Sequence, residues 1–267
     1  MAEIIGPLRF KGAMSGMNCY YNSLLKRWII RKNGGPSKAH IEKSSSCARI
    51  RENDEEMKAC DAWCKQVRYG LFDLDHLNAG YYMGEVVKLA KTIQKLDPIG
   101  LKGQRDVASS KYKSLMTDLN FNALHPFYQT LIRRPEVILD DERQTFIVNL
   151  AQFFPKQELV WGKQFFYYRF TLSITQLSDY NWVEAHRAHE AAHAKLHNSR
   201  KTVYTDWLDR YTEAVDISLT ASFKDNEILA EDTTVLVALG VEFATELSNK
   251  TISWNKGDGT MAIIASL

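Results

Sequence analysis

Hydrophobic residues in the stretch 44–96 recur at the three- and four-residue spacing of amphipathic helices. One stripe runs from Ile50 to Leu71, after serines at 44–46 that can cap a helix start. Another runs from Val86 to Leu96, where an Asp-Pro pair ends it. Both stripes are wide enough to pack on each other. The pattern predicts a helical segment over 38–117, with these two helices paired as a hairpin and a weaker third helix over 104–117.

From residue 118 onward the pattern changes to the alternation of apolar and polar residues that is typical of strands. The predicted strands cover 145–150, 165–174, 214–223, 235–243, 251–254 and 261–265, with a turn at 256–259. Six or more strands joined by short links indicate an antiparallel β-sandwich over 118–267.

The first 32 residues contain extended segments near 8–11, 17–21 and 28–31, separated by glycines and a turn. Few of their residues are suited to a core, and an isolated hairpin is marginal in water. A Gly-Gly-Pro-Ser linker follows at 34–37. The sequence therefore predicts an α+β chain: an extended N-terminal β-hairpin arm with linker over 1–37, the helical hairpin, and the C-terminal antiparallel β-sandwich.

Composition adds general limits. The 267 residues are 45% hydrophobic and 25% charged, with only 14 Gly and 6 Pro, which excludes a disordered or collagen-like chain. No run of 18 apolar residues is present, and the N-terminus lacks the pattern of a secretion signal. The four cysteines show no metal-binding spacing, and Cys60 with Cys64 is typical of buried thiols. We expect a cytoplasmic, reduced protein without a membrane span.

The segment His-Glu-Ala-Ala-His at 189–193 matches a zinc-protease signature. On a helix, His189 and His193 would share a face and ligate zinc, and Glu190 would act as general base. His197 extends the same stripe, and Glu213 follows His193 at roughly the distance at which such enzymes place a third ligand.

The flanks of this segment argue against an enzyme. Arg187 and Lys195 lie two residues outside the two His residues, and the neighbouring apolar positions are mostly alanine. Glu213 runs directly into a predicted strand rather than a helix. We therefore favour an exposed, Ala-rich helix or loop inserted into the sandwich at about 181–198, and we predict no catalytic residue, metal or other cofactor. A zinc-dependent hydrolase with the residues named above remains the alternative.

Charge is unevenly distributed along the chain. Residues 1–40 hold seven Lys and Arg against one acid, whereas residues 212–267 hold nine acids against three Lys. Opposite charges at the two ends can pair between neighbouring subunits. Nucleic-acid binding through the basic arm is a second alternative, although no nucleic-acid motif accompanies the arm.

Short motifs spread over most of the chain give a resemblance to a family. They are Ile-Gly-Pro-Leu-Arg-Phe-Lys-Gly at 5–12, Arg-Glu-Asn at 51–53 with Glu56, Lys-Gly-Gln-Arg at 102–105, Leu-Asn-Phe-Asn at 119–122, Gly-Val-Glu-Phe at 240–243 and Ser-Trp-Asn at 253–255. With these motifs the chain resembles an uncharacterised family of small proteins from Bacteroidetes. The resemblance implies no reaction.

An arm with little core of its own can add a strand to a neighbour's sheet, and a head-to-tail contact that does not close builds a filament, tube or sheath. We therefore predict a non-enzymatic structural protein that forms a homo-oligomer. The residues predicted to make the contact are Phe10, Tyr20, Trp28 and Arg31.

Overall fold

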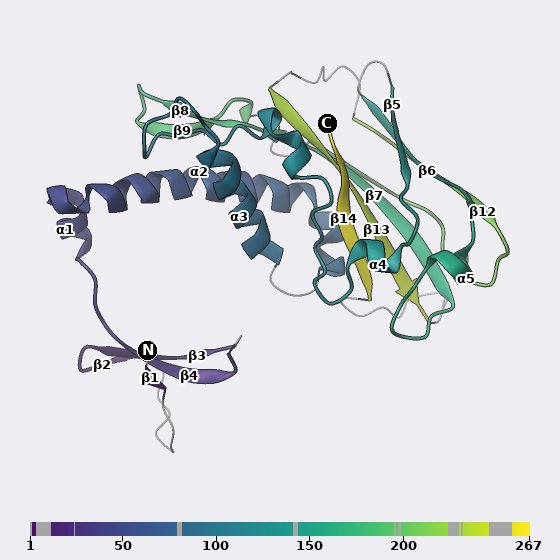
Figure 1. Cartoon of the computed structure of the whole chain (residues 1–267), viewed down its shortest axis with the longest axis horizontal. Helices are drawn as coiled ribbons and strands as arrows, with labels where there is room; N and C mark the ends of the chain where they lie inside the picture. The colour runs from purple at the N-terminus through teal and green to yellow at the C-terminus, as the bar shows by residue number, and fades with distance from the viewer. Residues whose placement is uncertain are drawn as a thin grey trace. The chain divides into compact units, whose positions relative to one another are not determined.

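The computed structural model describes residues 2–3, 12–23, 25–78, 82–140, 144–194, 196, 199–223, 230, 232–245 and 258–267. The chain divides into two compact units, residues 1–51 and residues 52–267, called here the first and the second unit. Figure 1 shows the order of the elements along the chain.

The fold is mixed α+β, as predicted. The helices are α1 (Lys38–Lys43), α2 (Ala48–Gly70), α3 (Tyr82–Lys95), α4 (Phe127–Thr130) and α5 (Pro155–Glu158), with 3-10 turns η1 (Ser45–Cys47), η2 (Phe72–Leu77), η3 (Ser109–Lys111) and η4 (Lys113–Leu115). The strands are β1 (Ala2–Glu3), β2 (Gly12–Met14), β3 (Met17–Asn22), β4 (Arg27–Lys32), β5 (Glu136–Leu139), β6 (Thr145–Phe153), β7 (Tyr167–Ser178), β8 (Tyr180–Val183), β9 (Ala188–Ala191), β10 (Arg200–Tyr204), β11 (Leu208–Asp209), β12 (Val215–Ser222), β13 (Thr233–Ala244) and β14 (Gly259–Ser266).

The first unit is a small antiparallel sheet in the order β1-β4-β3-β2, followed by α1. Cys19 and Ile29 are the only buried side chains of this sheet among the described residues, and register places them on opposite faces. The sheet therefore has almost no core between its own strands. Arg51 donates to the Ser44 carbonyl at 2.8 Å and so closes the turn after α1.

The second unit is built on the central sheet β10-β7-β13-β14, with β11 also paired to β7. Alternate residues of β13 point to opposite faces. Val237 and Leu239 belong to an apolar cluster shared with the second sheet, β12-β6-β5, whereas Leu236 and Ala238 belong to a cluster shared with α2, η2 and α3. The unit thus has three layers, and every residue of β13 is buried.

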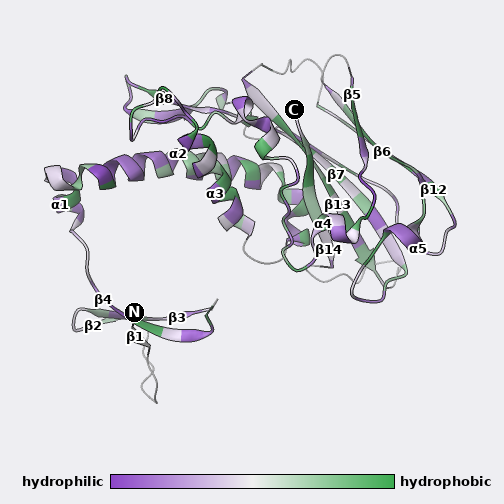
Figure 2. Cartoon of the chain, viewed as in Figure 1, coloured by the Kyte–Doolittle hydropathy of each residue, from purple (hydrophilic) through white to green (hydrophobic). Residues whose placement is uncertain are grey.

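Hydropathy follows this layering. Figure 2 shows β14 largely in the hydrophobic colour and the N-terminal half of α2 largely in the hydrophilic colour. The C-terminal half of α2 turns Trp63 and Val67 into the core, and Gly70 lies so close to β7 that an added Cβ would be 2.4 Å from Thr175 Oγ1. Among the described residues, none of the helices is both long and apolar enough to cross a bilayer.

Two sequence expectations about local structure were wrong. The stretch 104–117 forms only the short turns η3 and η4 instead of a third helix. Its polar groups are engaged by neighbouring strands: Val107 and Tyr180 exchange backbone hydrogen bonds, and Asp179 accepts from Ser109 and from the Ser110 N–H. Tertiary contacts have here overridden a weak helical preference. The second difference, at the His-rich segment, is described below. The predicted strand at 251–254 lies outside the described residues.

Candidate functional site

The His-rich segment forms a β-hairpin, not a helix. Strand β9 carries His189 and Glu190 and pairs with β8, so that His189 lies opposite Trp182. The two rings meet edge to face, with centroids 5.1 Å apart. A short alanine-rich helix is marginal on its own, and the cross-strand pair and the anchoring contacts described below favour the hairpin.

The candidate zinc ligands have separate partners. His189 Nε2 lies 2.9 Å from the Arg105 carbonyl, which only accepts, so this nitrogen donates. His193 Nε2 pairs with Asp232 Oδ1 at 2.6 Å, and Glu190 pairs with the His186 ring at 2.6 Å.

The remaining candidates do not complete a site. Glu213 is exposed in the loop before β12, and His197 lies outside the described residues. Within the part of the chain that the structure describes, no three His, Cys, Asp or Glu side chains are grouped to hold a metal ion. The described residues thus provide no geometry for the zinc reaction.

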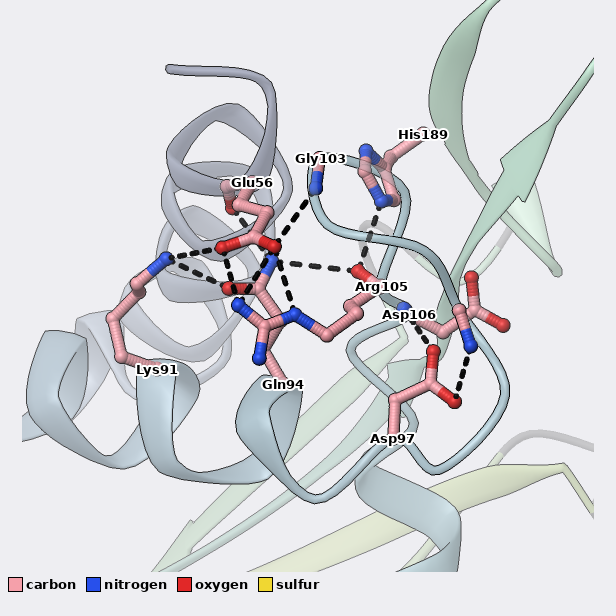
Figure 3. Close-up of polar contacts among 9 residues, drawn as sticks. Glu56, Lys91, Gln94, Asp97, Gly103, Arg105, Asp106 and His189 are labelled. Atoms are coloured by element: carbon pink, nitrogen blue, oxygen red, sulfur yellow. Dashed lines mark hydrogen bonds and ion pairs between the residues drawn. The ribbon is translucent and has the colours of Figure 1, made fainter. Parts of the chain in front are cut away.

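The most elaborate polar constellation is centred on Glu56 of α2, a fully buried carboxylate (Figure 3). Arg105 contacts it with two nitrogens, Nε at 2.8 Å from Oε1 and Nη2 at 2.9 Å from Oε2. The Gly103 N–H donates to Oε1 at 3.0 Å, and Lys91 Nζ lies 3.4 Å from Oε2. Gln94 donates to the Glu56 carbonyl at 2.9 Å. This Glu56 cluster joins α2, α3 and the loop that follows α3.

Electrostatics keep Glu56 ionised. Burial alone raises the pKa of this carboxyl, but the hydrogen bonds from Arg105 and Gly103 and the positive charges of Arg105 and Lys91 outweigh burial and lower the pKa to about 2. Both carboxylate oxygens already accept several hydrogen bonds. Glu56 is therefore suited to holding segments together and unsuited to accepting a proton as a general base.

The Glu56 cluster fixes the loop 96–106. Asp97 accepts from the backbone N–H groups of Ile99 at 3.0 Å and Gly100 at 3.2 Å through one oxygen, and from Asp106 at 2.8 Å through the other. These backbone hydrogen bonds outweigh burial and lower the pKa of Asp97. Gly100 permits the tight turn, since an added Cβ would lie 2.4 Å from Asp97 Oδ2. Asp97 thus ties the start of the loop to its end, and Glu56 holds the middle of the loop through the Gly103 N–H.

The β8–β9 hairpin is fastened to the same loop. The Trp182 N–H donates to Asp106 Oδ1 at 2.7 Å, one residue from the Arg105 carbonyl that accepts from His189. Burial is the main cause that raises the pKa of Asp106, partly offset by the Trp182 hydrogen bond. His189 is therefore a loop anchor rather than a metal ligand in this geometry.

The loop presents large apolar side chains to solvent. Ile99 is 86% exposed and Leu101 is 70% exposed, although the backbone beneath them is tightly hydrogen-bonded. Apolar residues held rigidly in water are typical of a contact surface. In the sequence, Asp97 indicates only the end of a helix. The sequence signal for this exposed surface is the presence of two large apolar residues, Ile99 and Leu101, inside a turn motif.

A second buried carboxylate lies in the Gly-Val-Glu-Phe motif. Glu242 of β13 accepts from Arg169 at 2.8 Å and from Thr171 at 2.8 Å, and His76 Nε2 lies 3.3 Å away. Burial raises the pKa of Glu242, but the hydrogen bonds from His76, Arg169 and Thr171 lower it overall. Like Glu56, this carboxylate is saturated and joins elements, here η2 with β7 and β13.

Cys60 and Cys64 are buried thiols, as expected from the sequence, and Cys19 and Cys47 are buried as well. All four are free and buried. Burial raises the pKa of Cys60 to about 11 and that of Cys64 to about 12. Such thiols carry little thiolate and are poor metal ligands and nucleophiles.

The predicted contact residues of the N-terminal arm lie on the first unit's sheet, except Phe10, which is outside the described residues. Arg31 lies over the Tyr20 ring at 5.6 Å on one face. On the other face Trp28 meets Tyr21 edge to face at 5.7 Å, next to Met14 and Met17. Met14, Met17 and Tyr21 are 55%, 39% and 49% exposed. The sheet thus presents an apolar face, called here the Trp28 face.

The two units have opposite net charge. Residues 1–51 hold ten Lys and Arg against two acidic residues, which leaves 24 Lys and Arg against 30 acidic residues in 52–267. The formal charges are therefore +8 and −6, consistent with the total of +2. The asymmetry noted along the sequence coincides with the division between the units.

A comparison of the chain with known protein families, curated proteins and solved structures finds no match. The resemblance to a Bacteroidetes family thus stays an expectation, and function is inferred from the geometry of this chain.

Proposed function

We propose that the protein is a non-enzymatic subunit that assembles with copies of itself, the first unit of one copy docking on the second unit of a neighbour. The observation that carries this proposal is the coincidence of charge and exposed apolar surface. The unit with a charge of +8 is also the one whose sheet exposes Met14, Met17 and Tyr21 and buries almost nothing.

Physical chemistry supports a partner for this sheet. A small sheet without a core of its own gains stability by burying a face, at roughly 25 cal/mol per Å² of apolar surface removed from water. Opposite net charges on two docking surfaces speed encounter and disfavour like-charged arrangements. A second copy supplies the acidic partner that such a basic sheet requires, and a contact of head on tail can continue along a chain of copies.

The two alternatives have weaker support. Zinc chemistry requires ligands that converge, whereas His189 and His193 bond to different groups. Nucleic-acid binding would use the same positive charge together with stacking on Tyr21 and Trp28. Because the net negative charge of the second unit is part of the same chain, we favour self-assembly and treat nucleic-acid binding as an outcome of the test.

The test is the mass of the full-length protein in solution, measured by light scattering over a dilution series. The wild type is expected to exceed the mass of one chain. Reversing Lys26, Arg27, Arg31 and Lys32 to Glu is expected to reduce that mass to one or a few chains, because attraction becomes repulsion. Raising the salt concentration is expected to reduce it less, since salt screens charge but leaves apolar contacts intact.

A matched control makes the same change of total charge on the second unit, where Lys65, Lys88, Lys156 and Lys201 are exposed. Reversal of these four to Glu should leave the mass unchanged. A wild type that is a single chain at every concentration would overturn the proposal. Tight binding of single-stranded nucleic acid, lost on reversing the four basic residues of the first unit, would replace it with the second alternative.

A further inference from the structure

The second unit contains a pocket of about 300 Å³ between its two sheets. Leu139 and Phe146 line it from β5 and β6, and Val235 and Leu267 line it from β13 and from the residue after β14. Ala230 adds a further apolar wall. An apolar cavity of about 150 Å³ holds one benzene molecule, so a pocket of this size accommodates a ligand of roughly ten carbon atoms.

The burial of the lining residues distinguishes the depth of the pocket from its rim. Phe146 is 0% exposed and Val235 is 2% exposed, so the deep end is apolar and shielded from water. Leu267, by contrast, is 37% exposed, and Leu139 and Lys113 are half-buried. A ligand that follows this gradient has an apolar part in the depth and its polar part at the rim.

The uncharged polar groups of the pocket are already engaged. Thr233 Oγ1 donates to the Ala230 carbonyl at 2.7 Å. Ser266 Oγ bonds to Thr117 Oγ1 at 2.9 Å and donates to the Lys113 carbonyl. A polar group placed in the depth would lose its hydrogen bonds to water without replacing them. The inner part of the pocket therefore favours a hydrocarbon chain.

Charge selects the other end of the ligand. Lys113 is the one charged side chain among the described residues that line the pocket. It has an interaction of its own, but an ammonium group carries three donors and can bind a carboxylate in addition.

The acidic residues next to the lining residues in sequence are engaged elsewhere. Asp140 Oδ1 accepts from the Gln144 N–H at 2.7 Å, and Asp232 Oδ1 pairs with His193 Nε2 at 2.6 Å. An anionic group at the rim thus matches the charge of the pocket lining, whereas an ammonium group would meet Lys113 as a like charge.

We propose that this pocket binds an aliphatic monocarboxylate of about eight to twelve carbons, with its chain against Phe146 and Val235 and its carboxylate at Lys113. The inference goes beyond the proposed function. All described lining residues belong to the second unit, so binding requires neither the first unit nor a second copy.

The experiment is a calorimetric titration of the full-length protein with decanoate, kept below the concentration at which it forms micelles. One decanoate should bind per chain, with a Kd of roughly 10–100 µM for a ligand of this size. Decanol, which has the same chain without the charge, should bind roughly 10-fold more weakly, because it cannot form the ion pair with Lys113.

Two variants locate the site. Ala230→Trp fills the pocket and should abolish binding of both ligands. Lys113→Met keeps most of the side-chain volume and should weaken decanoate roughly 10-fold while leaving decanol unchanged. Lys88→Met is the matched control, because the Lys88 side chain is 75% exposed on α3 and does not line the pocket; it should bind both ligands as the wild type does.

Each contrary result has a distinct meaning. A wild type that does not bind decanoate overturns the proposal, and so does a folded Ala230→Trp variant that binds it as well as the wild type. Equal loss of decanoate binding in Lys113→Met and Lys88→Met would show a general effect of charge and also overturn it. If Ala230→Trp is unfolded by circular dichroism, Lys113→Met with its two ligands decides alone. None of these results depends on the mass of the protein in solution, so failure here leaves the proposed assembly untouched.

Discussion

The two units differ in how far their sheets are covered by other parts of the chain. Both are built on antiparallel sheets, but the second unit covers its central sheet on both faces, with helices on one side and a second sheet on the other. The first unit leaves Met14, Met17 and Tyr21 exposed on its Trp28 face, although Cys19 on the same face is buried. A sheet covered on both sides is stable by itself, whereas a sheet with exposed apolar side chains on one face has surface left for a partner. The larger buried core thus lies in the second unit, and the sheet with exposed apolar side chains lies in the first.

The two units also differ in the burial of their acidic residues. In the second unit, Glu56 and Glu242 are each surrounded by several donors that link separate elements. In the first unit, the described acidic residue Glu42 pairs with Lys38 at 3.9 Å on an exposed helix face. Mutations of similar chemistry should therefore have very different effects in the two units.

The largest effect is expected from Glu56→Ala. It leaves Arg105 partly buried without its carboxylate, and removing one member of a buried pair costs about 3–5 kcal/mol. Glu42→Ala, the matched change in the first unit, removes an exposed pair and should cost under about 0.5 kcal/mol. Urea unfolding measures both. A loss below about 1 kcal/mol for Glu56→Ala would contradict the structural role of the cluster.

Acid should destabilise the second unit. The pKa of Glu56 is about 2 in the folded protein against 4.5 for an unperturbed carboxyl. A depressed folded pKa contributes stability above the unfolded pKa and loses it as the pH falls, here between about pH 5 and pH 2, by up to about 3 kcal/mol. Asp97 and Glu242 shift in the same direction and add to the loss. Stability measured against pH should fall in this window and fall less steeply in Glu56→Gln; equal slopes would refute the assignment.

Packing offers a third comparison. A Cβ added at Gly240 would lie 2.5 Å from Leu77 Cδ1 and 3.0 Å from Leu74 Cδ2, so Gly240→Ala should cost about 1–3 kcal/mol through overpacking. A Cβ at Gly34 meets only the Lys32 carbonyl at 3.9 Å, and Gly34→Ala should be close to neutral. Thermal unfolding of the two variants checks the difference. Similar melting temperatures would show that η2 moves away from the sheet easily.

The smallest effect concerns His189. His189→Ala removes one hydrogen bond to the Arg105 carbonyl and should lower the free energy of unfolding by about 1 kcal/mol. Adding a metal chelator should leave the stability of the protein unchanged. His186→Ala removes only an exposed pair with Glu190 and should be neutral. A melting temperature of the wild type that falls on chelation would instead indicate a bound metal and revive the zinc alternative.

Most of the helices and strands can be predicted from the sequence, because the spacing of apolar residues indicates which side chains are buried. The strand predicted at 214–223 matches β12 to within one residue at each end, whereas the strand predicted at 165–174 is observed as β7 at Tyr167–Ser178. The His-rich segment was not predicted correctly, since its alanines suggested a helix, while Trp182 and His189 fixed a hairpin through contacts with a loop some 80 residues earlier.

The candidate site was harder to predict for the same reason. Glu56, Gly103 and Arg105 belong to two short motifs that were noted in the sequence, but nothing local indicates that the motifs meet. Ile99 and Leu101 look like ordinary core residues in a sequence. Only the structure shows that the loop is held outward and that both side chains are exposed.

The pairing of β7 with β13 has a consequence for folding during synthesis. Strand β7 ends at Ser178, yet its partner begins only at Thr233, where the two residues are paired. A ribosome adding about 5–20 residues per second needs several seconds to cover that interval. During that interval the twelve residues of β7 have been synthesised without their central neighbour. The newborn chain is then at its most prone to aggregate, and chaperone dependence during synthesis should centre on this strand.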